Sequence, residues 1–132
     1  MTYAIVYSRF NEKITQPLLE ECLRGFREAG HEPVVMEVPG AVEIPLAVQR
    51  LIQKEKPLAV VALGCVIKGD TEHYDAVCSM CSQGLMDVML RTETPVIFEV
   101  LMVDDIAKAR ARISKGYSAA QVAMEMAEKF TQ

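Results

Sequence analysis

The sequence has no tryptophan, few other aromatic side chains and no long apolar run. Phe, Tyr and Trp make up 6% of its 132 residues, so the core must be built from aliphatic side chains. No apolar stretch approaches the roughly 20 residues that a membrane-spanning helix needs. The N-terminus, Met1-Thr2-Tyr3-Ala4, lacks the basic and long apolar regions of a secretory signal. These absences predict a cytoplasmic protein that does not bind membranes.

Positive charge is also scarce. The chain has 14 Lys and Arg against 18 Asp and Glu, a formal net charge of −4, which argues against nucleic acid as a partner. Four cysteines in a chain without an export signal are expected to be reduced thiols. Cys78 and Cys81 have the spacing of a redox pair but lie inside a predicted helix, so we interpret them as structural thiols. No spacing of Cys and His predicts a metal site.

Aliphatic residues are abundant. The hydrophobic fraction is 51%, which is high for a chain of 132 residues. This length corresponds to one domain, residues 1–132, with a limited interior. We therefore expect part of the apolar surface to contact other subunits.

Short apolar runs alternate with helical patterns along the chain. The run at 58–63 is apolar throughout, as in a parallel strand covered on both faces. Strands are expected at 3–7, 33–38, 58–63 and 96–100, and helices at about 15–29, 43–54, 74–90, 105–113 and 118–130. Thr15 and Ser118 are the expected N-terminal caps of two of these helices, with a break at Gly116 before the last one.

Strands that are joined through helices must be parallel, and right-handed crossovers place helices on both faces of their sheet. The sequence therefore predicts an α/β fold, a flavodoxin-like three-layer sandwich with a four-stranded parallel sheet in the order 2-1-3-4. In such sheets ligands bind outside the carboxyl ends of the strands, where the strand order reverses. Three unusual segments follow strand ends and should converge there: Ser8–Asn11, Pro39–Glu43 and Gly64–His73.

The segment from Gly64 to His73 has the features of a phosphate site. Gly64 and Gly69 allow tight turns, and the helix that follows presents free N–H groups near Asp70 and Thr71 to an anion. His73 can exchange protons near neutral pH. The competing interpretation is an ordinary glycine-containing loop with a surface histidine, and spacing alone does not decide between the two.

Three further residues have suitable chemistry, and each also has a simpler explanation. Glu43, between two prolines and a glycine, can accept hydrogen bonds from sugar hydroxyls or merely complement a helix dipole. Phe10 can stack on a flat heterocycle, although a lone Phe usually belongs to a core. Arg112 can hold a phosphate with two hydrogen bonds, although such an Arg on a helix is usually a solvated charge.

Taken together and in this order, the segments resemble the lumazine synthase family, which catalyses the penultimate step of riboflavin synthesis. The resemblance extends from about residue 4 to residue 126. Its carriers are Ser8-Arg9-Phe10-Asn11, Val38 to Pro45, Gly64 to Asp75, Pro95 to Phe98, and Asp105-Ile106 with Arg112. The family usually has Arg at the position of Lys68 and Ala or Thr at that of Cys65, and one of its lysines matches Lys115 only if a gap is allowed.

The resemblance implies a transferase that condenses 5-amino-6-(D-ribitylamino)uracil with 3,4-dihydroxy-2-butanone 4-phosphate. The products are 6,7-dimethyl-8-ribityllumazine, phosphate and water, and no metal or other cofactor takes part. The implied partners are these small molecules and further copies of the chain, with riboflavin synthase as another candidate. Two alternatives stay open: a non-catalytic flavin- or lumazine-binding paralogue, and an archaeal-type riboflavin synthase, against which His73 and the Val38–Pro45 motif argue.

The same resemblance implies roles for particular residues. His73 is the expected proton shuttle. The pyrimidine substrate and its ribityl chain are expected to contact Phe10, Ala41, Val42, Glu43, Cys65, Val66, Ile67 and Phe98. The butanone phosphate is expected to contact Asp70, Thr71 and Arg112. Phe98 and Arg112 would reach the site from a neighbouring subunit, which implies a homopentamer with shared active sites.

Overall fold

A computed structural model of the chain describes residues 2–69 and 72–131. Its four strands form one fully parallel sheet in the order β2-β1-β3-β4. The predicted fold class and strand order are therefore confirmed. The strands are β1 (Ala4–Ser8), β2 (Val34–Val38), β3 (Val60–Ile67) and β4 (Val96–Val103).

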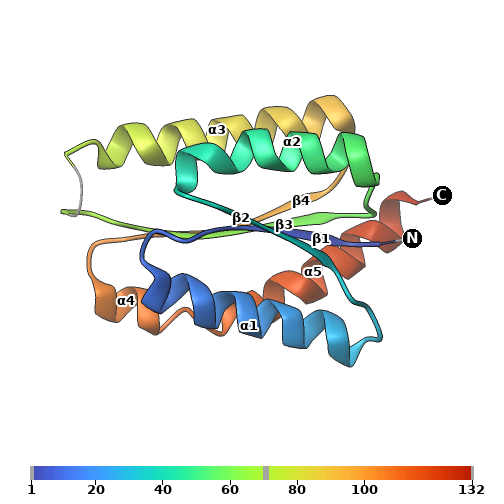
Figure 1. Cartoon of the computed structure of the whole chain (residues 1–132), viewed down its shortest axis with the longest axis horizontal. Helices are drawn as coiled ribbons and strands as arrows, with labels where there is room; N and C mark the ends of the chain where they lie inside the picture. The colour runs from blue at the N-terminus through green and yellow to red at the C-terminus, as the bar shows by residue number, and fades with distance from the viewer. Residues whose placement is uncertain (1, 70–71, 132) are drawn as a thin grey trace.

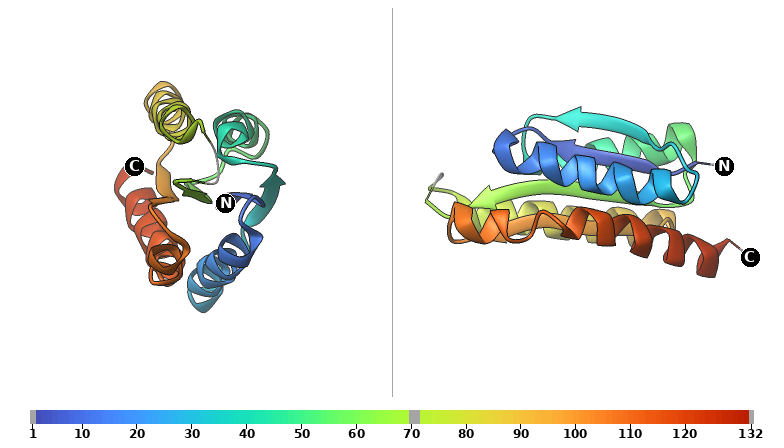
Figure 2. Two further views of the ribbon diagram at one scale, coloured as in Figure 1. Left: turned by 90° about the vertical axis from the view of Figure 1, so that its left-hand side faces the viewer. Right: turned by 90° about the horizontal axis from the view of Figure 1, so that it is seen from below.

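Helices cover both faces of the sheet (Figure 1). One layer contains α2 (Ile44–Glu55) and α3 (Tyr74–Thr92), and a short 3₁₀ helix, η1 (Ala41–Glu43), leads into α2. The other layer contains α1 (Glu12–Glu28), α4 (Ile106–Arg110) and α5 (Lys115–Phe130). Figure 2, which includes a view along the strands, shows the sheet between these two layers.

The central strand β3 is buried along its whole length, because β1 and β4 flank it and helices cover both of its faces. Its side chains alternate between two aliphatic clusters. Val61 and Leu63 pack with α1 and α5, whereas Val60 and Ala62 pack with α2 and α3. Each fully buried Val or Leu contributes about 1.5–3 kcal/mol, so the apolar run anchors the sheet whose ends carry the candidate site.

Helices α1 and α5 approach each other closely because glycines lie where they meet. A Cβ on Gly116 would overlap the Leu18 carbonyl oxygen, and one on Gly25 would lie 2.8 Å from Ala120 Cβ. The predicted break before the last helix lies at residues 111–114, and not at Gly116. Helix α5 begins at Lys115, and Ser118, the expected cap, lies within it.

Other predicted boundaries are also wrong. Strand β3 continues through Gly64 to Ile67, because these residues pair with Val100 to Val103 of β4, which is itself three residues longer than expected. Helix α1 begins at Glu12 after Asn11, so Thr15 is a buried residue of its first turns and not its cap. Helix α4 has 5 residues and is shorter than expected. Within the two described ranges, no helix is long and apolar enough to cross a membrane.

Candidate active site

The carboxyl ends of the strands share one end of the molecule, opposite the end where β1 begins and α5 finishes (Figure 1). Strand β1 continues into α1 on one face of the sheet, whereas its neighbour β3 continues towards α3 on the other face. A crevice forms where two adjacent parallel strands send their connections to opposite faces. The expected convergence of the three segments on one rim is confirmed for their described residues, 8–11, 39–43, 64–69 and 72–73.

A cavity of ≈ 200 Å³ lies at this point. Six residues that the sequence singled out line it: Phe10, Ala41, Val42, Glu43, Cys65 and Val66. Gly40 and Val77 line it too and were not assigned to the site from the sequence. Gly40 lay within a recognised motif, but Val77 fits the apolar stripe of α3, so nothing in the sequence distinguishes it from a core residue.

Phe10 stands where the chain leaves β1. Its side chain is 57% exposed, as expected of a ring that is not part of the core. The backbone N–H of Phe10 donates to the Pro39 carbonyl at 3.1 Å, and that of Arg9 donates to the Val38 carbonyl at 2.9 Å. These bonds extend the β1–β2 pairing past the end of both strands. The ring is thus presented beside the cavity on a fixed backbone and is available for stacking on a heterocycle.

Glu43 closes η1 and precedes α2. Its carboxylate folds back over Gly40, since a Cβ on that glycine would lie 3.2 Å from Glu43 Oε1. Gly40 has an extended backbone that any residue can adopt. Glycine therefore suits this position because it has no side chain, and not because of a left-handed conformation. The arrangement leaves an exposed carboxylate at the cavity wall, where it can accept hydrogen bonds from ligand hydroxyls.

The end of β3 offers mainly backbone to the cavity. The side chains of Cys65, Val66 and Ile67 are 2%, 7% and 8% exposed, so they are packed in the core and leave mainly backbone groups for a ligand. Ile67 lies beyond the two residues of this strand that line the cavity. The Cys65 carbonyl accepts a hydrogen bond of 2.9 Å from Asn11 Nδ2, which connects this strand end to the segment that carries Phe10.

His73 is exposed and directly precedes α3, where its carbonyl accepts from the Val77 N–H at 2.8 Å. A helix of 19 residues carries partial positive charge at this end, and its first N–H groups lack partners within the helix. His73 therefore stands at an end of α3 that favours anions. Asp70 and Thr71, the other residues expected here, lie outside the described residues.

Basic side chains surround one carboxylate on the same rim. Asp104 accepts a hydrogen bond of 2.9 Å from Lys108 Nζ, and that bond holds the pKa of Asp104 below its usual value. The charges of Lys68 and Arg112 lower this pKa further. Arg112 and Lys68 thus belong to one electrostatic neighbourhood beyond the end of β4.

Phe98 and Arg112 do not line the cavity of their own chain. Phe98 is 40% exposed on β4, the strand at one edge of the sheet, and is paired with Ala62 of β3. Cys65, the nearest β3 residue that lines the cavity, follows Ala62 by three residues, so Phe98 lies about 10 Å back along the sheet from the cavity lining. Arg112 is exposed between α4 and α5.

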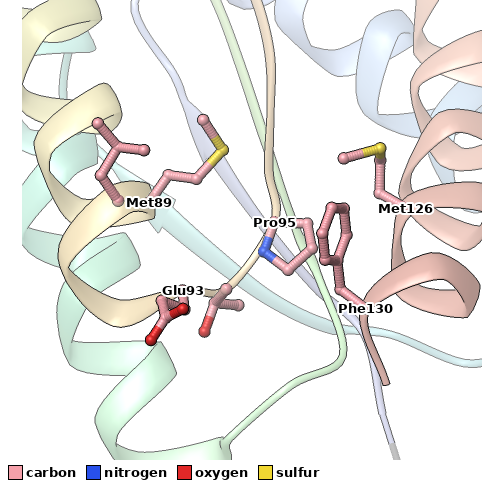
Figure 3. A pocket seen from close by; sticks show the side chains of 7 residues that line it. Met89, Glu93, Pro95, Met126 and Phe130 are labelled. Atoms are coloured by element: carbon pink, nitrogen blue, oxygen red, sulfur yellow. The ribbon is translucent and has the colours of Figure 1, made fainter. Parts of the chain in front are cut away.

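A second cavity of ≈ 320 Å³ lies at the opposite end of β4, between the ends of α3 and α5 (Figure 3). Its lining residues are Met89, Leu90, Glu93, Thr94, Pro95, Met126 and Phe130. None of them was expected to take part in a site. Within residues 2–69 and 72–131, no group of three or more His, Cys, Asp or Glu side chains could hold a metal ion.

Comparison with known proteins identifies the family. The family model described as 6,7-dimethyl-8-ribityllumazine synthase matches residues 1–131. The chain belongs to the lumazine synthase family. It is 41% identical over 131 residues to a 6,7-dimethyl-8-ribityllumazine synthase of Thermus thermophilus, covering 93% of this chain and 83% of that protein. A protein of the same name from Xanthomonas euvesicatoria is 41% identical over 133 residues, covering 94% and 86%. The cavity between β1 and β3 is therefore the candidate active site of a lumazine synthase family member.

Proposed function

We propose that this chain condenses 5-amino-6-(D-ribitylamino)uracil with 3,4-dihydroxy-2-butanone 4-phosphate to form 6,7-dimethyl-8-ribityllumazine, phosphate and water in riboflavin biosynthesis. Membership of the lumazine synthase family over residues 1–131 supports this reaction. The structural observation that carries it is the meeting of Phe10, Glu43 and the end of β3 around one cavity. An aromatic face, a carboxylate and strand backbone suit a flat pyrimidine with a polyhydroxyl chain.

On this proposal the pyrimidine ring stacks on Phe10, and the ribityl hydroxyls donate to Glu43. Backbone groups of Ala41, Val42 and the segment Cys65–Ile67 bind the edge of the ring. The buried side chains of that segment support a backbone role, because they are already packed in the core. Strand backbone is a rigid platform, and rigid placement of two reactants can contribute as much to the rate as acid–base chemistry.

The phosphate end of the second substrate would lie at the N-terminus of α3. Backbone N–H groups of Asp70 and Thr71, with Arg112 of a neighbouring copy, would hold the phosphate and stabilise its charge as it leaves. His73 would carry protons to and from oxygen and nitrogen while the amine attacks the ketone. The condensation is redox-neutral overall, so it requires no redox cofactor.

We further propose a homopentamer of single-domain chains in the cytoplasm, in which neighbouring copies complete each active site. The cavity of ≈ 200 Å³ is smaller than the roughly 300 Å³ at which ligand pockets usually begin, which is consistent with a site that a neighbouring copy extends. Apolar side chains exposed on or beside β4 support a contact there: Phe98 (40%), Met86 (51%), Phe130 (65%) and Leu90 (68%). The second cavity, at the same edge of the sheet, adds to this apolar surface (Figure 3).

The reaction can be tested by mixing the purified chain with both substrates and following the absorbance and fluorescence of the lumazine product. Glu43→Gln should raise the KM for the pyrimidine substrate by about tenfold or more, because hydrogen bonds to a charged group are worth about 1.5–3 kcal/mol. Glu125→Gln, on the exposed face of α5, is the matched control and should leave the kinetics unchanged. A wild-type rate equal to the spontaneous background would refute the proposal, and tight lumazine binding without turnover would support the non-catalytic paralogue.

The shared site can be tested by complementation. Glu43→Ala and Arg112→Ala should each lose most activity, since one damages the cavity and the other the residue proposed to reach it from a neighbour. Pentamers assembled from a mixture of the two variants should regain activity at the interfaces where both contributing residues are intact. A monomeric mass in solution, or mixed pentamers no more active than the separate variants, would contradict a site built between subunits.

A further inference from the structure

Asn11, between β1 and α1, has an unusual backbone and an unusual hydrogen bond. Its φ of 64° and ψ of 49° place it in the left-handed region, which few residues other than Gly, Asn and Asp adopt readily. It is the N-cap of α1, yet among the described residues its side chain makes no capping bond to that helix. The amide instead donates to the carbonyl of Cys65, which lies 54 residues away along the chain.

This bond joins two walls of the candidate active site. Phe10 directly precedes Asn11, and both Phe10 and Cys65 line the cavity. On the β2 side, the Phe10 backbone is held by the Pro39 carbonyl at 3.1 Å. On the β3 side, Asn11 Nδ2 reaches the Cys65 carbonyl at 2.9 Å. The segment that carries the aromatic ring is therefore fixed from both sides at the point where β1 and β3 diverge.

The ring itself has few restraints of its own, because the Phe10 side chain is 57% exposed. Its distance from the β3 backbone depends on where the segment from Ser8 to Asn11 is held. We propose that Asn11 is a positioning residue for the pyrimidine substrate, whose amide sets the spacing between the Phe10 ring and the Cys65–Val66 backbone. The inference rests on the proposed function and deepens it, because it assigns the Asn11 amide to one substrate of the two.

Two substitutions separate this role from a general role in folding. Asn11→Gly keeps the left-handed backbone without strain and removes the amide. Asn11→Asp keeps the shape and the capping ability but turns an oxygen towards the Cys65 carbonyl, which cannot donate a hydrogen bond to it. Lys56 offers a matched control, because it has a left-handed φ of 47° at the end of α2 and does not line the cavity. Lys56→Gly introduces the same flexibility elsewhere.

The experiment is steady-state kinetics with each substrate varied in turn, together with calorimetric titration of the pyrimidine substrate alone. Asn11→Gly and Asn11→Asp should raise the KM and the dissociation constant for the pyrimidine by about tenfold, the size expected when one hydrogen bond that orders a site is lost. The KM for the butanone phosphate should stay within about twofold of wild type. Lys56→Gly should match wild type in all these measurements.

Equal increases in both KM values, or pyrimidine binding by Asn11→Gly as tight as by Lys56→Gly, would overturn the inference. Urea unfolding of the same samples shows whether the Asn11 variants are folded under the assay conditions. If Asn11→Gly is not folded, Asn11→Asp provides the test of the positioning role. Wild-type turnover together with unchanged pyrimidine binding in both Asn11 variants would refute the positioning role alone. An inactive wild-type chain would instead refute the proposed function.

Discussion

The packing that holds the end of β3 beneath the cavity can be tested by a double-mutant cycle between Ser8 and Gly64. A Cβ added to Gly64 would lie 2.7 Å from Ser8 Oγ, 3.2 Å from Val100 Cγ1 and 3.4 Å from Ile44 Cδ1. The Ser8 side chain is 1% exposed, and its hydroxyl has no hydrogen-bond partner in the described part of the chain. The two residues therefore compete for one small space between β1 and β3.

The expected energies follow from these distances. Gly64→Ala alone should destabilise the fold by about 1–2 kcal/mol, because overpacking costs about 1–3 kcal/mol and the reduced entropy of the unfolded chain offsets about 0.5–1 kcal/mol. Ser8→Ala alone should stabilise it by up to about 1 kcal/mol, since it removes a buried hydroxyl that lacks a partner. In the Ser8→Ala background the closest clash is gone, so Gly64→Ala should become neutral or stabilising.

The assay is urea unfolding followed by circular dichroism, because the chain has no tryptophan to report by fluorescence. All variants are compared at one subunit concentration, since assembly would link stability to concentration. The coupling energy between the two substitutions should therefore be about 1–2 kcal/mol or more. Gly84→Ala is the control, because its Cβ would lie 2.8 Å from Pro45 Cγ, a contact that Ser8→Ala does not relieve. Additivity within about 0.5 kcal/mol for Ser8 and Gly64 would refute the reasoning.

Three further outcomes are expected. Gly116→Ala should lower the unfolding free energy by about 2 kcal/mol in urea unfolding, because the new Cβ meets a backbone oxygen of α1 that cannot rotate away. Burial raises the pKa of Glu99, so ionisation costs the folded chain more than the unfolded one. Glu99→Gln should therefore raise the free energy of unfolding by about 0.5–1 kcal/mol near neutral pH, a modest value because the side chain is partly exposed. In urea unfolding below about pH 4, where Glu99 is protonated in both states, this gain in stability should disappear. Burial raises the pKa values of Cys22 and Cys81 to about 12, so both should resist alkylation near pH 8, as followed by mass spectrometry, until the chain unfolds.

The strand order was predictable because it depends on features that the sequence carries directly. Apolar runs separated by helical patterns require parallel strands, and chirality then leaves few topologies. The boundaries were less predictable. Gly64 follows the apolar run at 58–63, and a glycine there predicts the start of a loop, but β4 continues beside it and supplies backbone partners through Ile67. Thr15 has the residue type of a cap, whereas Asn11 reaches the N-cap position through a left-handed backbone that no local pattern specifies.

The candidate site was predictable only in part, for a similar reason. Phe10 follows β1, Glu43 directly precedes α2, and Cys65 lies near the carboxyl end of β3, so topology alone brings them together. Val77 lies inside α3 and has no feature that separates it from the core side chains of that helix. The role of Asn11 depends on a hydrogen bond to a backbone carbonyl, and a sequence does not specify the partners of backbone carbonyls.

The separation of Phe98 from the cavity has a consequence for assembly. Phe98 belongs to β4, while Phe10 follows β1 on the other side of β3, and no rotation of either side chain spans that distance. If Phe98 and Arg112 complete a site, they complete the site of another copy, so each chain presents a cavity to one neighbour and an edge to the next. When the two surfaces of a chain face different neighbours, such head-to-tail contacts close into a ring if the rotation between neighbours closes, and form an open filament if it does not. The proposed pentamer is a closed ring of this kind, in which every cavity meets an edge.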